Sequence, residues 1–577
     1  MTILNNMTFK IAGAAGQGLE SSGAGFAEAL AKGGLHVFGL QDYMSRIRGG
    51  LNFFQVRVHE QPLYAHEDPV HVLLPLNEEA VEAYQDEVVE GGGIIYDAGL
   101  KVDAGTVSGK GRKAMPVPLI DIAKENGDRV MANTAAAGAA AGVSDYPFER
   151  LGDVIRANFK RKGDEVVNAN LRVGQAAYQY AQEKYASDFG WKLRQVDHAP
   201  QRMVMTGNQA FALGALAGGC RFMAAYPMTP STSIIEWMAR HEKFGVVAKH
   251  AEDEIAAVCM AIGANFAGAR AMVATSGGGF SLMVEGLGLA GMCEVPLVVL
   301  EGQRGGPSTG LPTRTEQGDL LFVLNASQGE FARLVMAPGS IEEYFVCGWR
   351  AFNLAEKYQT PVIVLADELL ASSVRTIEVD AIDFDGVVID RGKLLTTEEL
   401  DGLTEPYKRH LFTDDGISPR AIPGHPKAVY ATASDEHDEF GHITEEKLNR
   451  RRMMQKRMTK LETARQEIRP PTRYGPAEAP IILVGWGSTY GVLREVVDRL
   501  AGRARLVHFC DLWPFPAEAA AEALKGGKLV TVENNYTGQF KRLLQGATCI
   551  AVDHTILRYD GHAFSPEDII AELKEVG

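Results

Sequence analysis

The side chains best suited to chemistry lie in four short stretches, each of which follows an apolar, strand-like segment. They are Tyr226–Thr232, the turn at Glu252, Thr275–Gly279 and Gln303–Arg314. In the first stretch Thr229 stands between two prolines, which restrain the loop that presents its hydroxyl, whereas Ser231 is equally explained as a helix N-cap. Two arginines in the last stretch, Arg304 and Arg314, are suited to binding a carboxylate.

The turn at Glu252 precedes a helix rich in Ala, Met and Val. Acidic residues in a first turn often only complement the helix dipole, and Asp253 and Glu254 are explained in this way. A carboxylate against an apolar wall can instead have its pKa raised enough to share a proton with a ligand nitrogen. We therefore interpret Glu252 as the candidate acid–base residue.

A second candidate site lies near the amino terminus, where Gly13, Gly16 and Gly18 form a GxxGxG turn between a strand and a helix. Such a turn can hold a phosphate through backbone N–H groups and the helix dipole. The spacing is not the GxGxxG dinucleotide fingerprint, which disfavours NAD. Arg46 and Arg48 beside a diglycine could add bidentate phosphate contacts. An inert turn with solvated arginines remains the alternative.

The charged run Asp435–Glu439, followed by His442, resembles a metal cluster but is better explained as a solvated or inter-domain contact surface. The six cysteines form no CxxC pair, so neither an iron–sulfur motif nor a zinc ribbon is predicted in this chain. We predict no metal site.

The composition of the 577 residues is that of an ordinary globular protein, and its length predicts three or four domains. The formal net charge of -15 argues against nucleic-acid binding, which needs a basic field. No apolar stretch approaches the roughly 20 residues of a membrane helix, and no secretory signal is apparent. We expect a soluble, cytoplasmic protein.

Strands and helices alternate clearly over residues 201–385, with strands predicted at 220–225, 246–250, 270–275 and 296–300. This order predicts a doubly wound, mostly parallel α/β sheet, which binds ligands at the carboxyl ends of its strands. Three further regions are predicted: an α/β domain at 1–190, a charged linker with one helix at 386–475, and a small α/β domain at 476–577.

Taken together, these motifs resemble the α subunit of the 2-oxoacid:ferredoxin oxidoreductases, in the form with a γ domain fused ahead of α. Tyr226–Ser231 is similar to the family's Tyr-Pro-Ile-Thr-Pro-Ser motif, and Arg304–Thr313 to its Arg-x-Gly-Pro-Ser-Thr-Gly-x-Pro-Thr loop. Glu436–Gly441 and Glu533–Gln539 match two further family motifs, the second with one extra residue. The resemblance spans nearly the whole chain.

The resemblance implies a γ-type domain at 1–190, a thiamine-diphosphate pyrimidine-binding domain at 201–385 and a transketolase-like domain at 476–577. It implies oxidative decarboxylation of a 2-oxoacid, with coenzyme A taking the acyl group and ferredoxin the electrons. The cofactor-binding residues it implies are Tyr226, Pro227, Thr275, Ser276, Gly277 and Glu252. Gly13, Gly16, Gly18, Arg46 and Arg48 would bind coenzyme A.

The resemblance also implies that the chain works only with a β subunit, which carries the diphosphate, Mg²⁺ and a [4Fe–4S] cluster, in a dimer of αβ heterodimers. This chain has neither a GDG motif with a downstream Asn pair nor a cysteine ligand set. Glu252, Thr229 and Arg304 would be the catalytic residues. Thr229, Ser231 and Arg304 would bind the substrate, with Arg314 at the second carboxylate of 2-oxoglutarate. The alternatives are pyruvate or a branched-chain 2-oxoacid as substrate, or a non-catalytic nucleotide-binding or regulatory subunit.

Overall fold

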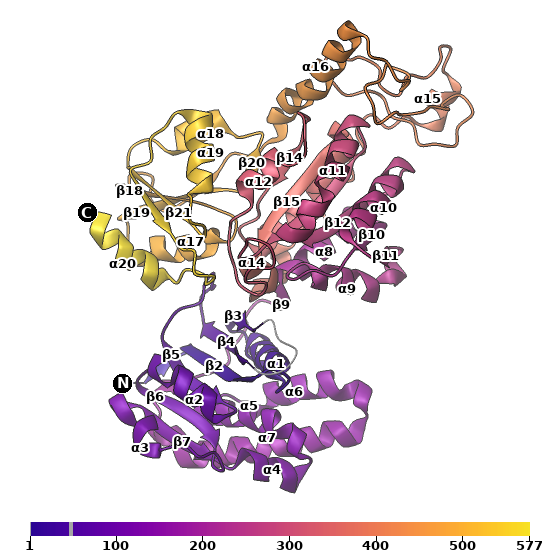
Figure 1. Ribbon diagram of the computed structural model, residues 1–577. Helices are drawn as coiled ribbons and strands as arrows, with labels where there is room; N and C mark the ends of the chain where they lie inside the picture. Colours follow the sequence, from indigo (N-terminus) through magenta and orange to yellow (C-terminus); the bar gives the residue numbers. More distant parts are fainter. Residues whose placement is uncertain (1, 45–49, 577) are drawn as a thin grey trace. The chain divides into compact units, whose positions relative to one another are not determined.

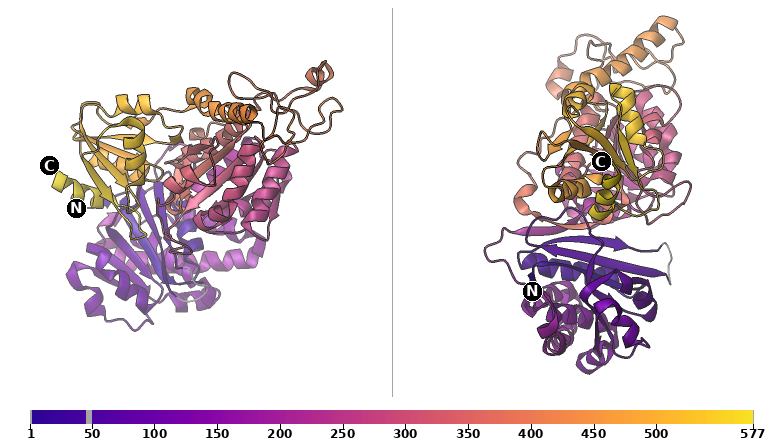
Figure 2. Two further views of the ribbon diagram at one scale, coloured as in Figure 1. Left: turned by 45° about the horizontal axis from the view of Figure 1, so that its top comes forward. Right: turned by 90° about the vertical axis from the view of Figure 1, so that its left-hand side faces the viewer.

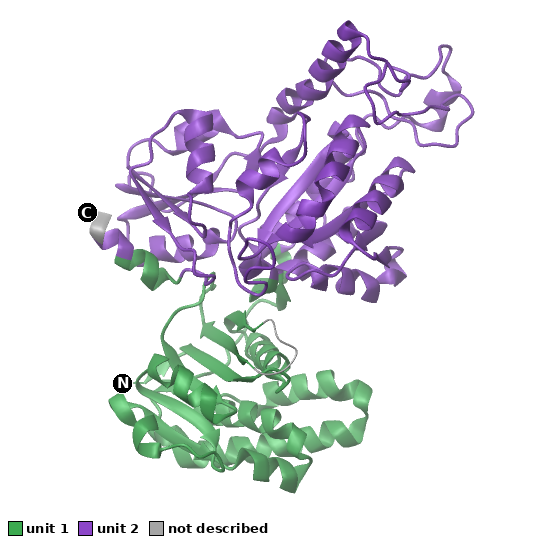
Figure 3. Ribbon diagram, in the orientation of Figure 1, with its two compact units in different colours: residues 1–206, 372–381, 565–571 green, residues 207–371, 382–564, 572–577 purple. Residues whose placement is uncertain are grey.

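The computed structural model describes residues 2–44 and 50–576, without the side chains of the last two (Figure 1). The chain forms two compact units, which are coloured separately in Figure 3. The first comprises residues 1–206, 372–381 and 565–571, and the second comprises 207–371, 382–564 and 572–577. None of the helices in the described ranges combines the length and apolar character of a membrane span.

The first unit is built on an eight-stranded mixed sheet with the order β7-β6-β5-β2-β4-β3-β16-β9. Its strands are β2 (Asn6–Ala14), β3 (His36–Asp42), β4 (Leu51–His59), β5 (Val70–Pro75), β6 (Val88–Asp97), β7 (Lys113–Val117), β9 (Arg202–Thr206) and β16 (Val374–Glu378). A separate pair is formed by β1 (Ile3–Leu4) and β8 (Trp191–Lys192). The sequence predicts strands at 9–12 and 36–39 on either side of the first helix, and both are present as parts of β2 and β3. They are not neighbours, because β4 lies between them and pairs antiparallel with both.

The helices of this unit are α1 (Leu19–Lys32), α2 (Glu78–Tyr84), α3 (Ala104–Val107), α4 (Leu119–Asn126), α5 (Ala132–Val143), α6 (Phe148–Phe159) and α7 (Asp164–Tyr185). Helices α1 and α4–α7 share one apolar core with β2 and β4, while α2 packs on a smaller core against β5 and β6. In the right-hand view of Figure 2 the purple helices lie on one side of the indigo strands. α5 and α7 approach closely because they meet at Gly138 and Gly174.

The second unit contains a seven-stranded sheet with the order β11-β10-β12-β13-β15-β14-β20. Its strands are β10 (Phe222–Ala225), β11 (Val247–His250), β12 (Ala271–Ser276), β13 (Leu297–Gln303), β14 (Leu334–Met336), β15 (Pro361–Asp367) and β20 (Asp511–Trp513). All neighbours are parallel except β14 and β20. This confirms the doubly wound, mostly parallel α/β fold, although the sheet also takes an edge strand from far along the chain.

Two layers of helices cover this sheet. One layer consists of α10 (Glu254–Phe266), α11 (Gly277–Met292) and α12 (Leu320–Asn325), and the other of α8 (Gly207–Ala217), α9 (Thr232–Arg240) and α13 (Ile341–Tyr358). Alternate residues of the central strands face opposite layers, as Val299 and Leu300 of β13 do, so both faces are buried. A short helix, α14 (Glu368–Ser372), follows β15.

Residues 386–475 contain little regular structure apart from α15 (Thr397–Asp401) and α16 (Lys447–Ala464), and they belong to the second unit. A five-stranded sheet follows, made of β17 (Thr472–Tyr474), β18 (Ile481–Trp486), β19 (Ala504–Phe509), β21 (Lys528–Glu533) and β22 (His554–Leu557). Its helices are α17 (Thr489–Arg499), α18 (Ala517–Ala523) and α19 (Gln539–Thr548). The last helix of the chain is α20 (Pro566–Val576).

Candidate functional site

Three of the predicted stretches meet at one edge of the seven-stranded sheet. β12 and β13 run parallel, with Thr275 opposite Glu301, and β10 flanks β12 on the other side, so their carboxyl ends lie together. The hydroxyl of Thr275 lies 4.0 Å from the sulfur of Met228 in the loop that follows β10. The topology therefore brings together loops that are separated by tens of residues in the sequence.

The side chain of Arg304 joins two of these loops. Its Nη1 donates a hydrogen bond of 2.8 Å to the carbonyl oxygen of Thr229. Both residues are half-buried, whereas Tyr226 and Pro227, at the start of the same loop, are exposed. The contact uses the main chain of Thr229 and so fixes the loop without engaging its hydroxyl.

Ser231 has a structural role that the sequence analysis left open. It is buried and stands at the N-cap position of α9, but its side chain makes no capping bond. The hydroxyl donates instead to the carbonyl oxygen of Met228 at 2.8 Å. Ser231 thus closes the turn that presents Thr229.

The two glutamates at the start of α10 differ sharply in exposure. Glu252, the predicted acid–base residue, is exposed and precedes the helix, and Asp253 caps the helix by accepting from the N–H of Ala256 at 2.7 Å. Glu254 is only 3% exposed, and its Oε1 has no hydrogen-bond partner among the described residues. A Cβ placed on Gly279 would come within 2.6 Å of that oxygen and 2.0 Å of the Thr275 hydroxyl.

The sequence analysis explained Glu254 only by the helix dipole, although the helical spacing of its neighbours indicates a buried face. Glu254, Ala257, Val258 and Ala261 recur at the helical spacing of a buried face, and all four are buried. A carboxylate in that register points inward, whereas one two residues earlier does not. The structure therefore makes Glu254 the better candidate for the acid–base role.

Further buried polar atoms lie at the same sheet edge without partners in the described part of the chain. They are the hydroxyl of Ser276 and the carboxyl oxygens of Glu301, whose nearest polar neighbour is the carboxyl of Asp319. Burial, followed by the nearby carboxyl of Asp319, raises the pKa of Glu301 well above its usual value. Because buried polar groups are rarely left unpaired, this cluster fits a polar ligand that inserts at the sheet edge.

The loop after β13 is closed on itself and carries both candidate arginines. The N–H of Gly305 donates to the carbonyl of Arg314 at 3.3 Å, and the N–H of Leu311 donates to the carbonyl of Gly305 at 2.7 Å. Gly306–Leu311 between them is exposed, whereas Arg304 and Arg314 are half-buried. The loop thus holds the two guanidinium-bearing residues at a fixed backbone separation.

In the first unit, the glycine turn borders a cavity of about 650 Å³. Gly16, Gly18 and the start of α1 line it, whereas Gly13 is the penultimate residue of β2. Arg46 and Arg48 lie outside the described residues. Two cations that sequence reasoning missed, Arg129 and Lys162, also line this cavity, and no local sequence pattern distinguishes them from other surface cations.

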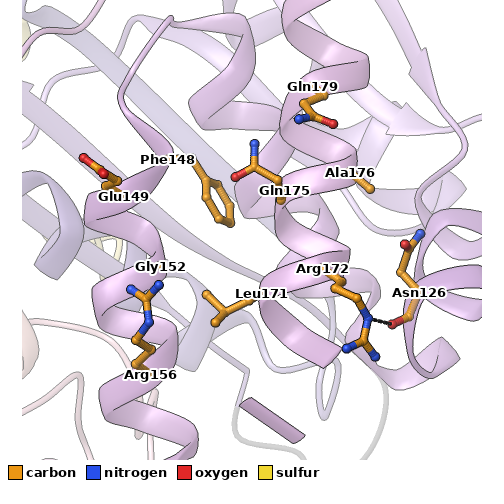
Figure 4. Close-up of a pocket in the computed structure, with 10 residues that line it drawn as sticks. All are labelled: Asn126, Phe148, Glu149, Gly152, Arg156, Leu171, Arg172, Gln175, Ala176 and Gln179. Atoms are coloured by element: carbon orange, nitrogen blue, oxygen red, sulfur yellow. Dashed lines mark hydrogen bonds between the residues drawn. The ribbon is translucent and has the colours of Figure 1, made fainter. Parts of the chain in front are cut away.

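A shallower groove of about 470 Å³ runs between α6 and α7 (Figure 4). Phe148 and Leu171 form its apolar part, and the dashed line in Figure 4 marks the bond of 3.3 Å from Arg172 to the carbonyl of Asn126. None of the predicted site residues lines this groove.

The charged run at 435–442 is engaged in contacts within the second unit. Glu436 accepts from Arg457 of α16 at 2.8 Å, and the ring of His437 lies 4.1 Å from that of His410. These contacts agree with a contact surface. Within the described ranges, no group of three or more His, Cys, Asp or Glu side chains is arranged to hold a metal ion.

Comparison with known proteins defines the class to which this fold and site belong. Residues 213–457 match the thiamine-diphosphate-binding domain of pyruvate flavodoxin/ferredoxin oxidoreductase, and residues 8–180 match the pyruvate ferredoxin/flavodoxin oxidoreductase family. The α subunit of a 2-oxoacid:ferredoxin oxidoreductase from a Sulfolobus species is 33% identical, covering 99% of this chain and 97% of that relative. The chain belongs to the family of 2-oxoacid:ferredoxin oxidoreductase α subunits, which confirms the resemblance seen in the motifs.

Two similar proteins are named for a particular substrate, 2-oxoglutarate. The 2-oxoglutarate oxidoreductase subunit KorA of Mycobacterium tuberculosis is 30% identical, covering 98% of this chain and 91% of that relative. The solved 2-oxoglutarate:ferredoxin oxidoreductase from Magnetococcus marinus, with 2-oxoglutarate, coenzyme A and succinyl-CoA bound, matches with a TM-score of 0.92 and 33% identity over 99% of both chains.

Proposed function

We propose that this chain, together with a second subunit, converts 2-oxoglutarate, coenzyme A and two oxidised ferredoxins to succinyl-CoA, CO₂, a proton and two reduced ferredoxins. The observation that carries the proposal is the closed loop after β13, which holds Arg304 against Thr229 at the sheet edge and carries Arg314 on its returning arm. The 2-oxoglutarate-acting relatives at nearly full coverage support the same choice of substrate.

The buried polar atoms at the sheet edge fit the aminopyrimidine part of thiamine diphosphate. Glu254 would hold a proton at a pyrimidine nitrogen, because its Oε1 is buried and without a partner among the described residues. Ser276 and Gly277 would border the ring, with Tyr226 and Pro227 at the exposed rim. When bound, the cofactor supplies the nucleophilic carbon for decarboxylation. We assign its diphosphate, the Mg²⁺ and the iron–sulfur cluster to the second subunit.

Arg304 and Thr229 would bind the carboxylate next to the reacting carbonyl of the substrate. This position is common to all 2-oxoacids and does not discriminate between them. Arg314 would bind the distal carboxylate, which pyruvate and branched-chain 2-oxoacids lack. Because a charge-assisted hydrogen bond contributes about 1.5–3 kcal/mol, one such contact favours a dicarboxylate by roughly ten- to a hundredfold.

The cavity at the start of α1 is the proposed site for the phosphates of coenzyme A. Gly16 and Gly18 border the cavity at the start of α1, where a helix N-terminus favours an anion. Arg129 and Lys162 add positive charge to a lining that also includes Glu78 and Asp97. Arg46 and Arg48 remain candidates for the same site.

The test is to purify the complex with its second subunit and compare 2-oxoacids in coenzyme-A-dependent reduction of a viologen dye. We expect kcat/KM for 2-oxoglutarate to exceed that for pyruvate and 2-oxobutyrate by about tenfold or more. Arg314→Met should remove this preference and leave 2-oxobutyrate turnover unchanged. Equal losses for both substrates would instead make Arg314 a loop support, and a preference for pyruvate in the unaltered complex would overturn the choice of substrate.

A further inference from the structure

Gln317, near the end of the loop after β13, has all of its polar groups bound to the five-stranded sheet (β17–β19, β21 and β22) or to the two residues that follow its strand β21. It is fully buried, and its Nε2 donates to the carbonyl of Trp486 at 2.9 Å. Its Oε1 accepts from the N–H of Asn534 at 3.0 Å, its N–H donates to the carbonyl of Asn534 at 2.6 Å, and its carbonyl accepts from the Asn535 side chain at 3.1 Å. Four hydrogen bonds to Trp486, Asn534 and Asn535 thus fix both the side chain and the main chain of Gln317.

A second contact fixes the adjacent peptide groups. The side chain of Gln539 donates to the carbonyl of Gly318 and accepts from the N–H of Leu321 at 2.8 Å, so it bridges the end of the loop and the start of α12. At the base of the loop, Gln303 accepts from the N–H of Asp319 at 3.0 Å. The loop that carries Arg304 and Arg314 is therefore fixed at both of its ends.

The C-terminal residues that make these contacts are themselves held by Glu533. Its carboxylate accepts from the Asn535 side chain at 3.0 Å and from the N–H groups of Phe540 and Lys541 at 2.7 and 3.0 Å. Asn535 in turn accepts from the N–H of Gly538 at 2.8 Å. Glu533 thus caps α19 and shapes the turn before it, as a carboxylate at a helix N-terminus does.

We propose that the segment Glu533–Gln539 is a positioning device, which sets the affinity for the 2-oxoacid by fixing the Arg304–Asp319 loop through Gln317 and Gly318. Gln317, Asn535 and Gln539 are its positioning residues, and none of them needs to touch the substrate. The inference rests on the proposed binding of the 2-oxoacid by this loop. A charge-assisted hydrogen bond contributes about 1.5–3 kcal/mol, so a loop that no longer presents Arg304 correctly should weaken binding of the 2-oxoacid by about tenfold or more.

The test is Gln539→Leu in the complex with the second subunit. We expect the KM for 2-oxoglutarate to rise about tenfold, with kcat changed less than about twofold and the KM for coenzyme A unchanged. Gln545→Leu is the matched control, because Gln545 lies on the same helix and is half-buried. Gln539→Glu keeps the acceptor for the N–H of Leu321 and loses the donor to Gly318. Its KM for 2-oxoglutarate should therefore lie between that of Gln539→Leu and that of the Gln545→Leu control.

Gln317→Met should show the same rise in KM, and the double variant with Gln539→Leu should show less than the product of the two effects, since both act on one segment. A KM like that of the Gln545 control in both single variants would overturn the inference. So would a loss of assembly with an unchanged KM in the remaining complex. Arg304→Met separates the two hypotheses: if it raises the KM while Gln539→Leu does not, only the positioning role fails. If Arg304→Met leaves the KM for every 2-oxoacid unchanged, substrate binding by the loop fails too.

Discussion

Glu252 and Glu254 stand two residues apart in the chain but in opposite surroundings, and their variants should differ accordingly. In the assembled enzyme, Glu254→Gln should slow turnover by about 10²-fold or more, the usual effect of removing an acid–base group. The reason is that its buried carboxyl oxygen lies beside the Thr275–Gly279 turn with no partner in the described part of the chain. Steady-state viologen reduction measures this loss.

Glu252→Gln is the matched control, because Glu252 is exposed before the helix begins. Near-normal turnover is expected for it, with unchanged assembly in both variants. The opposite result, an inactive Glu252 variant beside an active Glu254 variant, would restore the first interpretation of the sequence.

At the scale of elements, α16 is held against the rest of the second unit by a buried carboxylate. Glu294, in the turn between α11 and β13, lies 2.5 Å from the amino groups of both Lys456 and Lys460, and all three are buried. Burial alone would raise the pKa of Glu294, but the two lysines hold it well below its usual value. This stabilisation is present above the ordinary carboxyl pKa and is lost as the pH falls through the lowered value.

Glu294→Gln should therefore destabilise the region by about 3 kcal/mol or more, because it leaves two buried cations without a counter-charge. Hydrogen–deuterium exchange over 447–464 and the melting temperature of the complex measure the effect. Glu462→Gln on the same helix is the control, since its pair with Arg465 is exposed and contributes at most about 1 kcal/mol. Equal protection in the two variants would contradict a structural role for Glu294.

The two cations that line the cavity at the start of α1 should contribute to the affinity for coenzyme A. Arg129→Ala and Lys162→Ala should each raise the KM for coenzyme A by about tenfold, as expected for the loss of one charge-assisted contact. Reduction by 2-oxoglutarate in a single turnover without coenzyme A should not change. Lys160→Ala is the control, because Lys160 is also exposed and does not line the cavity. An unaltered KM for coenzyme A in both variants would contradict the binding of coenzyme A in this cavity.

For the whole molecule, the chain alone should be an incomplete enzyme. It has no motif for the metal-bound diphosphate, and none of its six cysteines forms a disulfide. Cys347 and Cys510 lie 3.7 Å apart, but no third ligand joins them among the described residues. We expect the purified chain to be colourless and inactive, and co-expression with the second subunit to restore both visible absorbance and viologen reduction. Iron analysis is the decisive measurement, since stoichiometric iron in the isolated chain would contradict the prediction.

Local sequence was enough to predict the strands β10, β12 and β13 of the second unit, because each is a short, mostly apolar run with a glycine or polar turn after it. It could not reveal β16 and β20, whose partners lie more than 100 residues away. The strand β4 was also missed, although it alternates in sequence, and its place between β2 and β3 in the sheet is a tertiary property. At the site, the sequence predicted Glu252 as the acid–base residue, whereas burial favours Glu254 as the candidate. The helical spacing of Glu254, Ala257, Val258 and Ala261 was the signal in the sequence that points to the buried carboxylate.

Because β9 pairs with β16, a cut in the chain before β9 keeps these two strands together on one fragment. The chain leaves the first unit's sheet after β9, forms part of the second unit, and returns through β16, which pairs with both β9 and β3. A break between residues 194 and 201 would therefore leave these two strands on the carboxyl-terminal fragment. That fragment should dock onto the exposed edge of β3 by strand addition. The two pieces would then behave as a self-assembling split protein rather than as independent domains.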